Sequence, residues 1–139
     1  DNPSAISQAE LDTWVQEKIV KYWGKLSDVR PAIAASSVYV LPSYREGTPR
    51  TVLEAMAMGR AIITTDAPGC RETVSNGVNG YLVAVKSVDD LVQSMQHFIE
   101  DPQLIAYMGQ RSREMALNKY DVQQVNRHML TDMQIIAKP

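Results

Sequence analysis

The sequence has little that would support a disulfide-rich, metal-bound or membrane-spanning protein. Its 139 residues include one cysteine, Cys70, and two histidines. A single cysteine excludes an internal disulfide framework and fits a reducing cytosol, and so few ligands cannot build a structural zinc site. Apolar runs such as Tyr81–Val85 are far too short to span a bilayer. The first residues, Asp1 to Ser4, show no signal-peptide pattern, so we expect no secretion signal.

Three further features are missing. The 14 lysines and arginines stand against 16 acidic residues and form no basic stripe, so a broad footprint for nucleic acid is absent. No Gly-x-Gly-x-x-Gly motif follows an apolar run, which argues against an epimerase or dehydrogenase of the dinucleotide-binding type. No Asp-x-Asp pair occurs, so we expect neither a metal site nor a cofactor.

What is present is the composition of one globular domain covering residues 1–139. Hydrophobic residues make up 45% and charged residues 22% of the chain, and the length suits a single core. Short β-like runs alternate with helical patterns, which predicts an α/β fold with a parallel sheet covered by helices on both faces. The four predicted strands are Ile19–Trp23, Val38–Leu41, Ala61–Thr65 and Tyr81–Val85, with Val38–Leu41 in a central position.

Helix signals lie between these runs. Ser7 and Glu10 form a capping box for a helix through about Lys18. Asp101 and Pro102 are typical of a helix start. The other predicted helices begin near 27–28, 48, 71, 87 and 121; the one after 87 has an apolar stripe of Val88, Leu91, Val92, Met95 and Phe98, and the last one of Val122, Val125, Met129, Met133 and Ile136.

The most informative segment runs from residue 42 to 56, at the carboxyl end of the predicted central strand, where open α/β sheets bind ligands. Thr48 is expected to cap the next helix, with Pro49 at its first position. The amides of Arg50 and Thr51 would then point outward at the positive end of the helix dipole, which suits a phosphate or diphosphate. Gly47 lacks a Cβ where an anion would approach the backbone.

Two carboxylates flank this predicted anion site. Glu46 lies in the loop before the helix and can reach a group beyond the distal phosphate. Glu54 lies about 9 Å along the helix from Thr48, and its side chain leans back toward the helix N-terminus. A carboxylate there can accept two hydrogen bonds from a ribose diol. Sugar, diphosphate and ribose would therefore lie in that order, as in a nucleotide sugar.

The same residues resemble a known family. Glu46 and Glu54, followed by Ala55-Met56-Ala57-Met58-Gly59, resemble the donor-binding signature of the family-4 retaining glycosyltransferases. The likeness continues downstream, through Ala61–Asp66, Gly69, Glu72–Val74, Asn79-Gly80 and Leu82-Val83, and covers about residues 23–120. Residues 43–74 look especially like bacterial enzymes that extend lipid-linked surface oligosaccharides, including N-acetylgalactosaminyltransferases.

The resemblance implies a Rossmann-like lobe within the two-lobed GT-B architecture, namely the C-terminal lobe that binds the donor. Glu46 would contact the donor sugar as the catalytic residue, Glu54 would hold the ribose, and backbone amides of residues 47–51 would face sugar and phosphate. Lys25 would line the nucleobase pocket. Arg50 departs from the family, where an aliphatic or small residue is common.

The resemblance also implies partners beyond the chain. The family's lobe begins with a further strand, loop and helix bearing a basic pair that clamps the diphosphate, and no basic residue in residues 1–18 fits that role. We therefore expect a lobe shortened at its start and without its acceptor lobe, hence inactive alone. The whole enzyme would transfer a sugar, as a uridine diphosphate derivative, to a lipid-linked or polysaccharide acceptor with retention, in the cytoplasm or at the cytoplasmic face of the inner membrane.

Simpler interpretations stand beside these. Glu54 on a helix can be a solvated surface charge, Glu46 can belong to a turn paired with Arg45, and the start of any helix needs a cap. The rival function is a non-catalytic flavodoxin-like or receiver-like regulatory domain. Asp66 is the only strand-end aspartate that could serve a receiver, and it lacks acidic neighbours.

Overall fold

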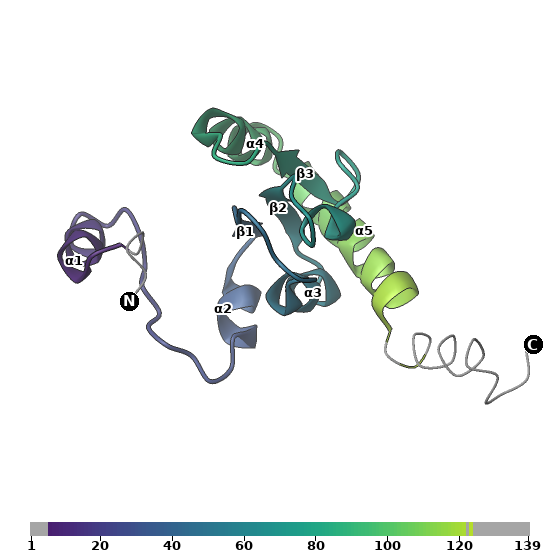
Figure 1. Ribbon diagram of the computed structural model, residues 1–139, viewed down its shortest axis with the longest axis horizontal. Coiled ribbons are helices and arrows are strands. Elements are labelled where there is room, and N and C mark those ends of the chain that lie inside the picture. The colour runs from purple at the N-terminus through teal and green to yellow at the C-terminus, as the bar shows by residue number, and fades with distance from the viewer. Residues whose placement is uncertain (1–5, 122, 124–139) are drawn as a thin grey trace, which may run out of the picture. The chain divides into compact units, whose positions relative to one another are not determined.

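The computed structural model describes residues 6–121 and residue 123 (Figure 1). The chain divides into two compact units, one reaching to Ala32 and one starting at Ile33, and each is described by itself. The predicted last helix, with its apolar face from Val122 to Ile136, lies outside the described residues.

The first unit begins with helix α1 (Gln8–Gln16), and its predicted capping box is confirmed. The Ser7 hydroxyl accepts the Glu10 amide at 3.2 Å, and the Glu10 carboxylate accepts the Ser7 amide at 3.1 Å. Hydrogen bonds from the Ser7 side chain and backbone lower the pKa of the Glu10 carboxyl. The helix ends before Lys18, whose φ of 59° lies in the left-handed region and cannot continue it.

The strand predicted at Ile19–Trp23 is wrong, because these residues form bends and irregular backbone. The run has the β-branched and aromatic residues of a strand, but no described strand pairs with it, and unpaired backbone groups give a strand no stability. Ile19, Tyr22 and Trp23 are consequently exposed. Helix α2 (Arg30–Ala35) follows, with the Asp28 carboxylate accepting the Arg30 amide at 3.0 Å.

The second unit contains a sheet of three parallel strands in the order β1 (Val38–Leu41), β2 (Ala61–Thr65), β3 (Gly80–Val83). The described chain thus has three strands where four were predicted. The central strand is β2, all five residues of which are buried, whereas β1 lies at an edge of the described sheet. The prediction that Val38–Leu41 is central is therefore wrong for the described residues.

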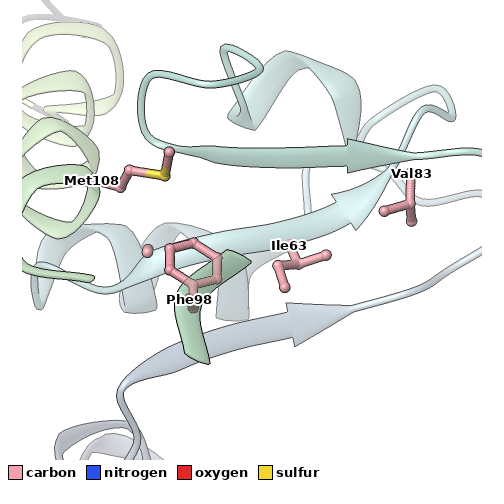
Figure 2. Close-up of a cluster of buried hydrophobic side chains, with 5 residues drawn as sticks. Ile63, Val83, Phe98 and Met108 are labelled. Atoms are coloured by element: carbon pink, nitrogen blue, oxygen red, sulfur yellow. The ribbon is translucent and has the colours of Figure 1, made fainter. Parts of the chain in front are cut away.

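Helices cover both faces of this sheet, as predicted. Ribbons of α3 (Arg50–Ala57) and α4 (Val88–Glu100) lie on either side of the strands in Figure 1. Because side chains alternate along a strand, Ala61 and Ile63 face the α4 layer. There they join a buried cluster with Val83, Phe98 and Met108 (Figure 2). On α3, the buried residues are Val52, Ala55 and Met56.

The apolar stripe predicted for α4 is only partly buried. Phe98 is buried and Leu91 half-buried, with Ser94 between them, but Val88, Val92 and Met95 are exposed. Residues 91, 94 and 98 lie on one face of the helix at helical spacing. The described strands cover only this face, so the other apolar side chains stay exposed. Ser87 caps α4 by accepting the Asp90 amide at 3.2 Å, as predicted.

Helix α5 (Gln103–Tyr120) packs against both β2 and α3. Its N-cap position is Pro102, one residue later than the predicted Asp101, and no side chain caps it. The Asp101 carboxylate accepts the Gln103 amide at 3.2 Å just before the helix. Helix α5 passes close to the backbone of Gly59, just before β2, and Gly109 permits this contact. A Cβ at position 109 would lie 2.3 Å from the Gly59 carbonyl oxygen. No helix in residues 6–121 is long and apolar enough to cross a membrane.

Asn79 connects the loop before β3 to α5. It is fully buried, and its amide nitrogen donates to the Thr73 carbonyl at 3.1 Å and to the Ser112 hydroxyl at 3.3 Å. Its side-chain oxygen accepts the Ser75 amide at 2.8 Å. Asn79 is therefore a buried polar junction as well as the turn residue that its pairing with Gly80 predicts, and it anchors the segment that follows the short 3₁₀ helix η1 (Arg71–Thr73).

Candidate functional site

The site is built on the loop that leaves the carboxyl end of β1. Two hydroxyls of the central strand direct this loop. Thr64 donates to the Leu41 carbonyl at 2.8 Å, and Thr65 donates to the Ser43 carbonyl. Both threonines are buried, so these bonds satisfy polar groups that water cannot reach. The polar end of β2 thereby holds residues 41–43 beside it.

Glu46 is positioned by its own loop and by the next one. The Ser43 hydroxyl donates to the Glu46 carboxylate at 2.8 Å, and the Glu46 amide donates to the Pro68 carbonyl at 3.3 Å. The side chain itself is exposed. Glu46 does not pair with Arg45 in a surface turn, because its carboxylate accepts the Ser43 hydroxyl instead. The remaining lone pairs of the carboxylate oxygens are available to other hydroxyl donors.

Gly69 allows the two loops to touch. Its φ is 84°, and a Cβ at this position would lie 2.1 Å from the Glu46 carbonyl oxygen and 2.4 Å from that of Gly47. No side chain fits at that distance, and few residues tolerate that φ. The loop after β2 thus forms a backbone support directly beneath the loop that carries Glu46.

Helix α3 begins one residue later than predicted. Its N-cap position is Pro49, with φ −73° and ψ 113°, and no side chain caps it. The predicted Thr48 cap is therefore wrong: Pro49 is buried and extended, outside the helix, and its carbonyl already accepts the Val52 amide at 3.0 Å. Thr48 is exposed in the preceding loop.

The first turn of α3 has the features of an anion-binding site. The amides of Arg50 and Thr51 find no acceptor among the described residues, and both residues are exposed. Free amides in the first turn carry the positive end of the helix dipole. Gly47, in the preceding loop, has open space where its Cβ would be. The arrangement suits a phosphate group approaching from solvent.

Glu54 lies one helical turn beyond this feature. Its carboxylate is 3.2 Å from the Arg50 Nε, and its side chain is 32% exposed against 90% for Arg50. An ion pair with so exposed a partner contributes at most about 1 kcal/mol, so a ligand can displace it. Glu54 also lines a hollow of about 330 Å³ between α3 and the end of α5, with Leu53, Ala116 and Tyr120 among its walls.

The structure places seven of the predicted site residues along one continuous segment, from the β1 loop into the first turns of α3. These are Glu46, Gly47, Thr48, Pro49, Arg50, Thr51 and Glu54. The eighth, Lys25, lies in the first unit, in a bend between α1 and α2, so its relation to the others stays a prediction.

Sequence reasoning missed the groups that support this segment. The hydroxyls of Thr64 and Thr65 and the close approach of Gly69 were not foreseen as site-forming. Two signals pointed to them: polar residues end an otherwise apolar strand, and a Pro-Gly pair follows it. Among residues 6–121 and 123, no three His, Cys, Asp or Glu side chains gather in a group that could hold a metal ion.

Comparison with known proteins gives a consistent result. The profile of the family described as "Glycosyl transferases group 1" matches residues 1–101. The N,N'-diacetylbacillosaminyl-diphospho-undecaprenol α-1,3-N-acetylgalactosaminyltransferase of Campylobacter jejuni is 36% identical over 121 residues, which is 87% of this chain and 31% of that protein. An Escherichia coli UDP-Gal:α-D-GlcNAc-diphosphoundecaprenol α-1,3-galactosyltransferase is 27% identical over 99 residues, 71% of this chain and 25% of that one.

Solved structures give the same picture. Anabaena HepE in complex with UDP superposes with a TM-score of 0.82 at 26% identity, covering 92% of this chain and 35% of that one. Sucrose-phosphate synthase from Thermosynechococcus elongatus gives 0.78 at 25% identity, with 99% and 37% covered. The chain thus spans about a third of the length of these relatives. The resemblance of this chain to these proteins disfavours the alternative of a non-catalytic flavodoxin-like or receiver-like regulatory domain.

Proposed function

Because this chain belongs to the group 1 glycosyl transferases, we propose that residues 1–139 form the donor-binding lobe of an enzyme that transfers a sugar from a uridine diphosphate derivative. The observation that carries the proposal is the placement of free amides at the start of α3, with Glu46 in the loop before them and Glu54 one turn beyond. That order matches sugar, diphosphate and ribose in the donor.

Each polar group then has a distinct task. Glu46 accepts hydroxyls of the transferred sugar at the reacting end, the amides of Arg50 and Thr51 receive the diphosphate, and Glu54 exchanges Arg50 for the ribose hydroxyls. Gly47, Thr48 and Pro49 shape the backbone between these groups. Lys25 belongs to the nucleobase pocket in the assembled enzyme.

The chemistry assigned to this lobe is positioning and charge stabilisation. As the sugar leaves, negative charge develops on the diphosphate, and preorganised amides at a helix N-terminus stabilise that charge without reorganising. A basic pair outside this chain completes the clamp, and transfer proceeds with retention and without a metal ion.

The acceptor in this proposal is lipid-linked, as the names of the C. jejuni and E. coli relatives suggest by analogy. The whole enzyme works in the cytoplasm or at the cytoplasmic face of the membrane. The chain alone should transfer no sugar, because the acceptor lobe and the basic pair are contributed from elsewhere. Transfer to a lipid-linked acceptor by the isolated chain would refute this part.

Titration of this chain with uridine diphosphate and with flavin mononucleotide tests the proposal. A donor-binding lobe should bind the uridine nucleotide in a one-to-one complex and ignore the flavin, whereas a flavodoxin-like domain should do the reverse. Glu54→Ala is the matched control, because it should weaken nucleotide binding on the order of 10-fold or more by removing a charged hydrogen-bond acceptor. Flavin binding, or nucleotide binding that is unaffected by Glu54→Ala, would overturn the assignment.

A further inference from the structure

Asp66 is a strand-end aspartate to which the proposed function gives no task. It directly follows β2, and its amide donates to the Val83 carbonyl at 2.8 Å, which fixes its backbone to the end of β3. Its carboxylate pairs with Arg71, with 2.9 Å between the Asp66 Oδ1 and the Arg71 Nε. Asp66 is therefore a fixed point at the edge of the sheet to which Arg71 is attached.

Arg71 joins the end of the loop after β2 to its beginning. Besides the bond to the carboxylate, its Nη2 donates to the Asp66 carbonyl at 3.0 Å. The backbone amide of Arg71 donates to the Ala67 carbonyl, also at 3.0 Å. Bonds from a charged guanidinium are stronger than those between neutral groups. The Asp66–Arg71 pair thus closes residues 66–71 into one compact turn, the 66–71 loop.

The middle of the 66–71 loop is the part that contacts Glu46. The Pro68 carbonyl accepts the Glu46 amide at 3.3 Å, and Gly69 lies so close that its Cβ would be 2.1 Å from the Glu46 carbonyl oxygen. Both contacts are made to the backbone of Glu46, so they set the point from which its carboxylate projects. The position of that carboxylate therefore depends on a loop whose two ends Asp66 and Arg71 join.

The Asp66–Arg71 pair is too exposed to contribute much to stability, since its side chains are 58% and 49% exposed. Arg111 and Glu114 on α5 form a pair of similar length, 2.8 Å, with side chains 45% and 42% exposed. That pair joins two turns of one helix, whereas the first pair closes the loop beneath Glu46. The two pairs are alike in strength and differ in what they connect.

We propose that Asp66 and Arg71 are positioning residues for sugar transfer, which hold the 66–71 loop so that the Glu46 carboxylate meets the donor sugar. The inference rests on the proposed function and adds two residues that act through the backbone of Glu46. Reacting groups must be held to within about 0.5 Å, and a displacement of about 1 Å can cost on the order of 100-fold in rate. Loss of the pair should therefore lower turnover much more than it lowers Tm.

Amide hydrogen exchange, measured by NMR on this chain, tests the pair without any sugar. In Arg71→Ala the Glu46 amide should exchange about 2- to 5-fold faster, the change expected when a partly exposed ion pair is lost. Arg111→Ala is the matched control and should leave that rate unchanged. Asp66→Asn removes the charge and keeps the size of the side chain, so it gives the same test if Arg71→Ala does not fold. A wild-type rate in Arg71→Ala, or an equal increase in Arg111→Ala, would overturn the inference.

Kinetics of the complete enzyme separate positioning from a merely structural role. Arg71→Ala should lower kcat about 10-fold and leave the Kd for uridine diphosphate unchanged, because the nucleotide is held at α3. Arg71→Lys should restore part of the rate, since an ammonium keeps the charge but loses the fork of the guanidinium. A structural role would instead lower Tm and weaken the nucleotide together. That result, or an unchanged kcat in Arg71→Ala, would overturn the positioning role.

The outcomes also distinguish this inference from the proposed function. Failure of the unaltered chain to bind uridine diphosphate overturns the donor-binding function and, with it, the role of the pair in transfer, even where the Glu46 amide responds to Arg71→Ala. Binding of uridine diphosphate together with a Glu46 amide that ignores Arg71→Ala overturns only the role of the Asp66–Arg71 pair.

Discussion

At the residue scale, the loop that carries Glu46 rests on a backbone contact with Gly69. The contact joins the loops after β1 and β2, and it combines a left-handed φ with a distance that leaves no space for a Cβ. The Pro-Gly pair predicts a turn here, but the sequence contains no sign that the turn touches a loop more than twenty residues earlier. Such a contact arises from the pairing of β1 with β2, which brings the two loops to the same edge of the sheet.

Gly69→Ala should destabilise the protein by about 2–5 kcal/mol, of which about 1–2 comes from the left-handed backbone and the remainder from overpacking against the Glu46 carbonyl. Gly77→Ala is the control, because Gly77 has φ 77° but open space around its Cβ position, so only the backbone cost of about 1–2 kcal/mol applies. Urea unfolding of both variants measures the difference. Equal losses would mean that the loop contact is not close in solution.

At the element scale, periodicity and turn chemistry predicted most of the second unit. The bounds of β2 match the prediction, and the starts of α4 and η1 agree with it. The failures have physical causes. A strand needs a partner, which Ile19–Trp23 lacks among the described residues. A helix start depends on whether Pro49 is buried outside the helix, which local preference cannot reveal.

The contact between α5 and the segment before β2 predicts a change in stability opposite to the one that helix propensity predicts. Gly→Ala inside a helix normally stabilises by about 1 kcal/mol. Gly109→Ala should instead destabilise by about 1–3 kcal/mol, because the new Cβ would lie 2.3 Å from the Gly59 carbonyl oxygen.

The matched control is Ala106→Gly at an exposed position of the same helix. It should cost about 1 kcal/mol from propensity alone. Thermal unfolding of both variants checks the two values. A rise in Tm for Gly109→Ala would show that α5 does not cross at this contact.

At the scale of the whole molecule, the three-stranded sheet with α3 and α4 on its two faces brings every strand-end loop to one edge. The proposed donor site lies there, on the loop that leaves β1 and at the start of α3. The sequence could indicate the donor residues because they are contiguous in the chain. It could not indicate that Lys86 lies near the ring of Tyr44, because these two residues meet only through the pairing of the strands.

The complete enzyme should not depend on a metal ion. The motivation is the sequence, in which no Asp-x-Asp pair occurs to bind a divalent cation beside the diphosphate. Helix amides and the basic pair should stabilise the leaving diphosphate instead. Steady-state transfer rates measured with excess chelator should equal those without it. A rate that collapses in chelator and returns with Mn²⁺ would contradict this expectation.

The central claim is that Glu54 serves the ribose end and Glu46 the sugar end of one nucleotide-sugar site. Calorimetric titration of the complete enzyme with uridine diphosphate, together with donor kinetics, tests it directly in the variants Glu46→Ala and Glu54→Ala. Loss of a hydrogen bond to a charged group costs about 1.5–3 kcal/mol, or on the order of 10- to 100-fold in affinity. Glu54→Ala should weaken uridine diphosphate and donor sugar by similar factors. Glu46→Ala should leave uridine diphosphate affinity nearly unchanged and lower the turnover of the donor, because its contact is made at the reacting end. If Glu46→Ala weakens the bare nucleotide as much as Glu54→Ala does, the assignment of the two ends is wrong.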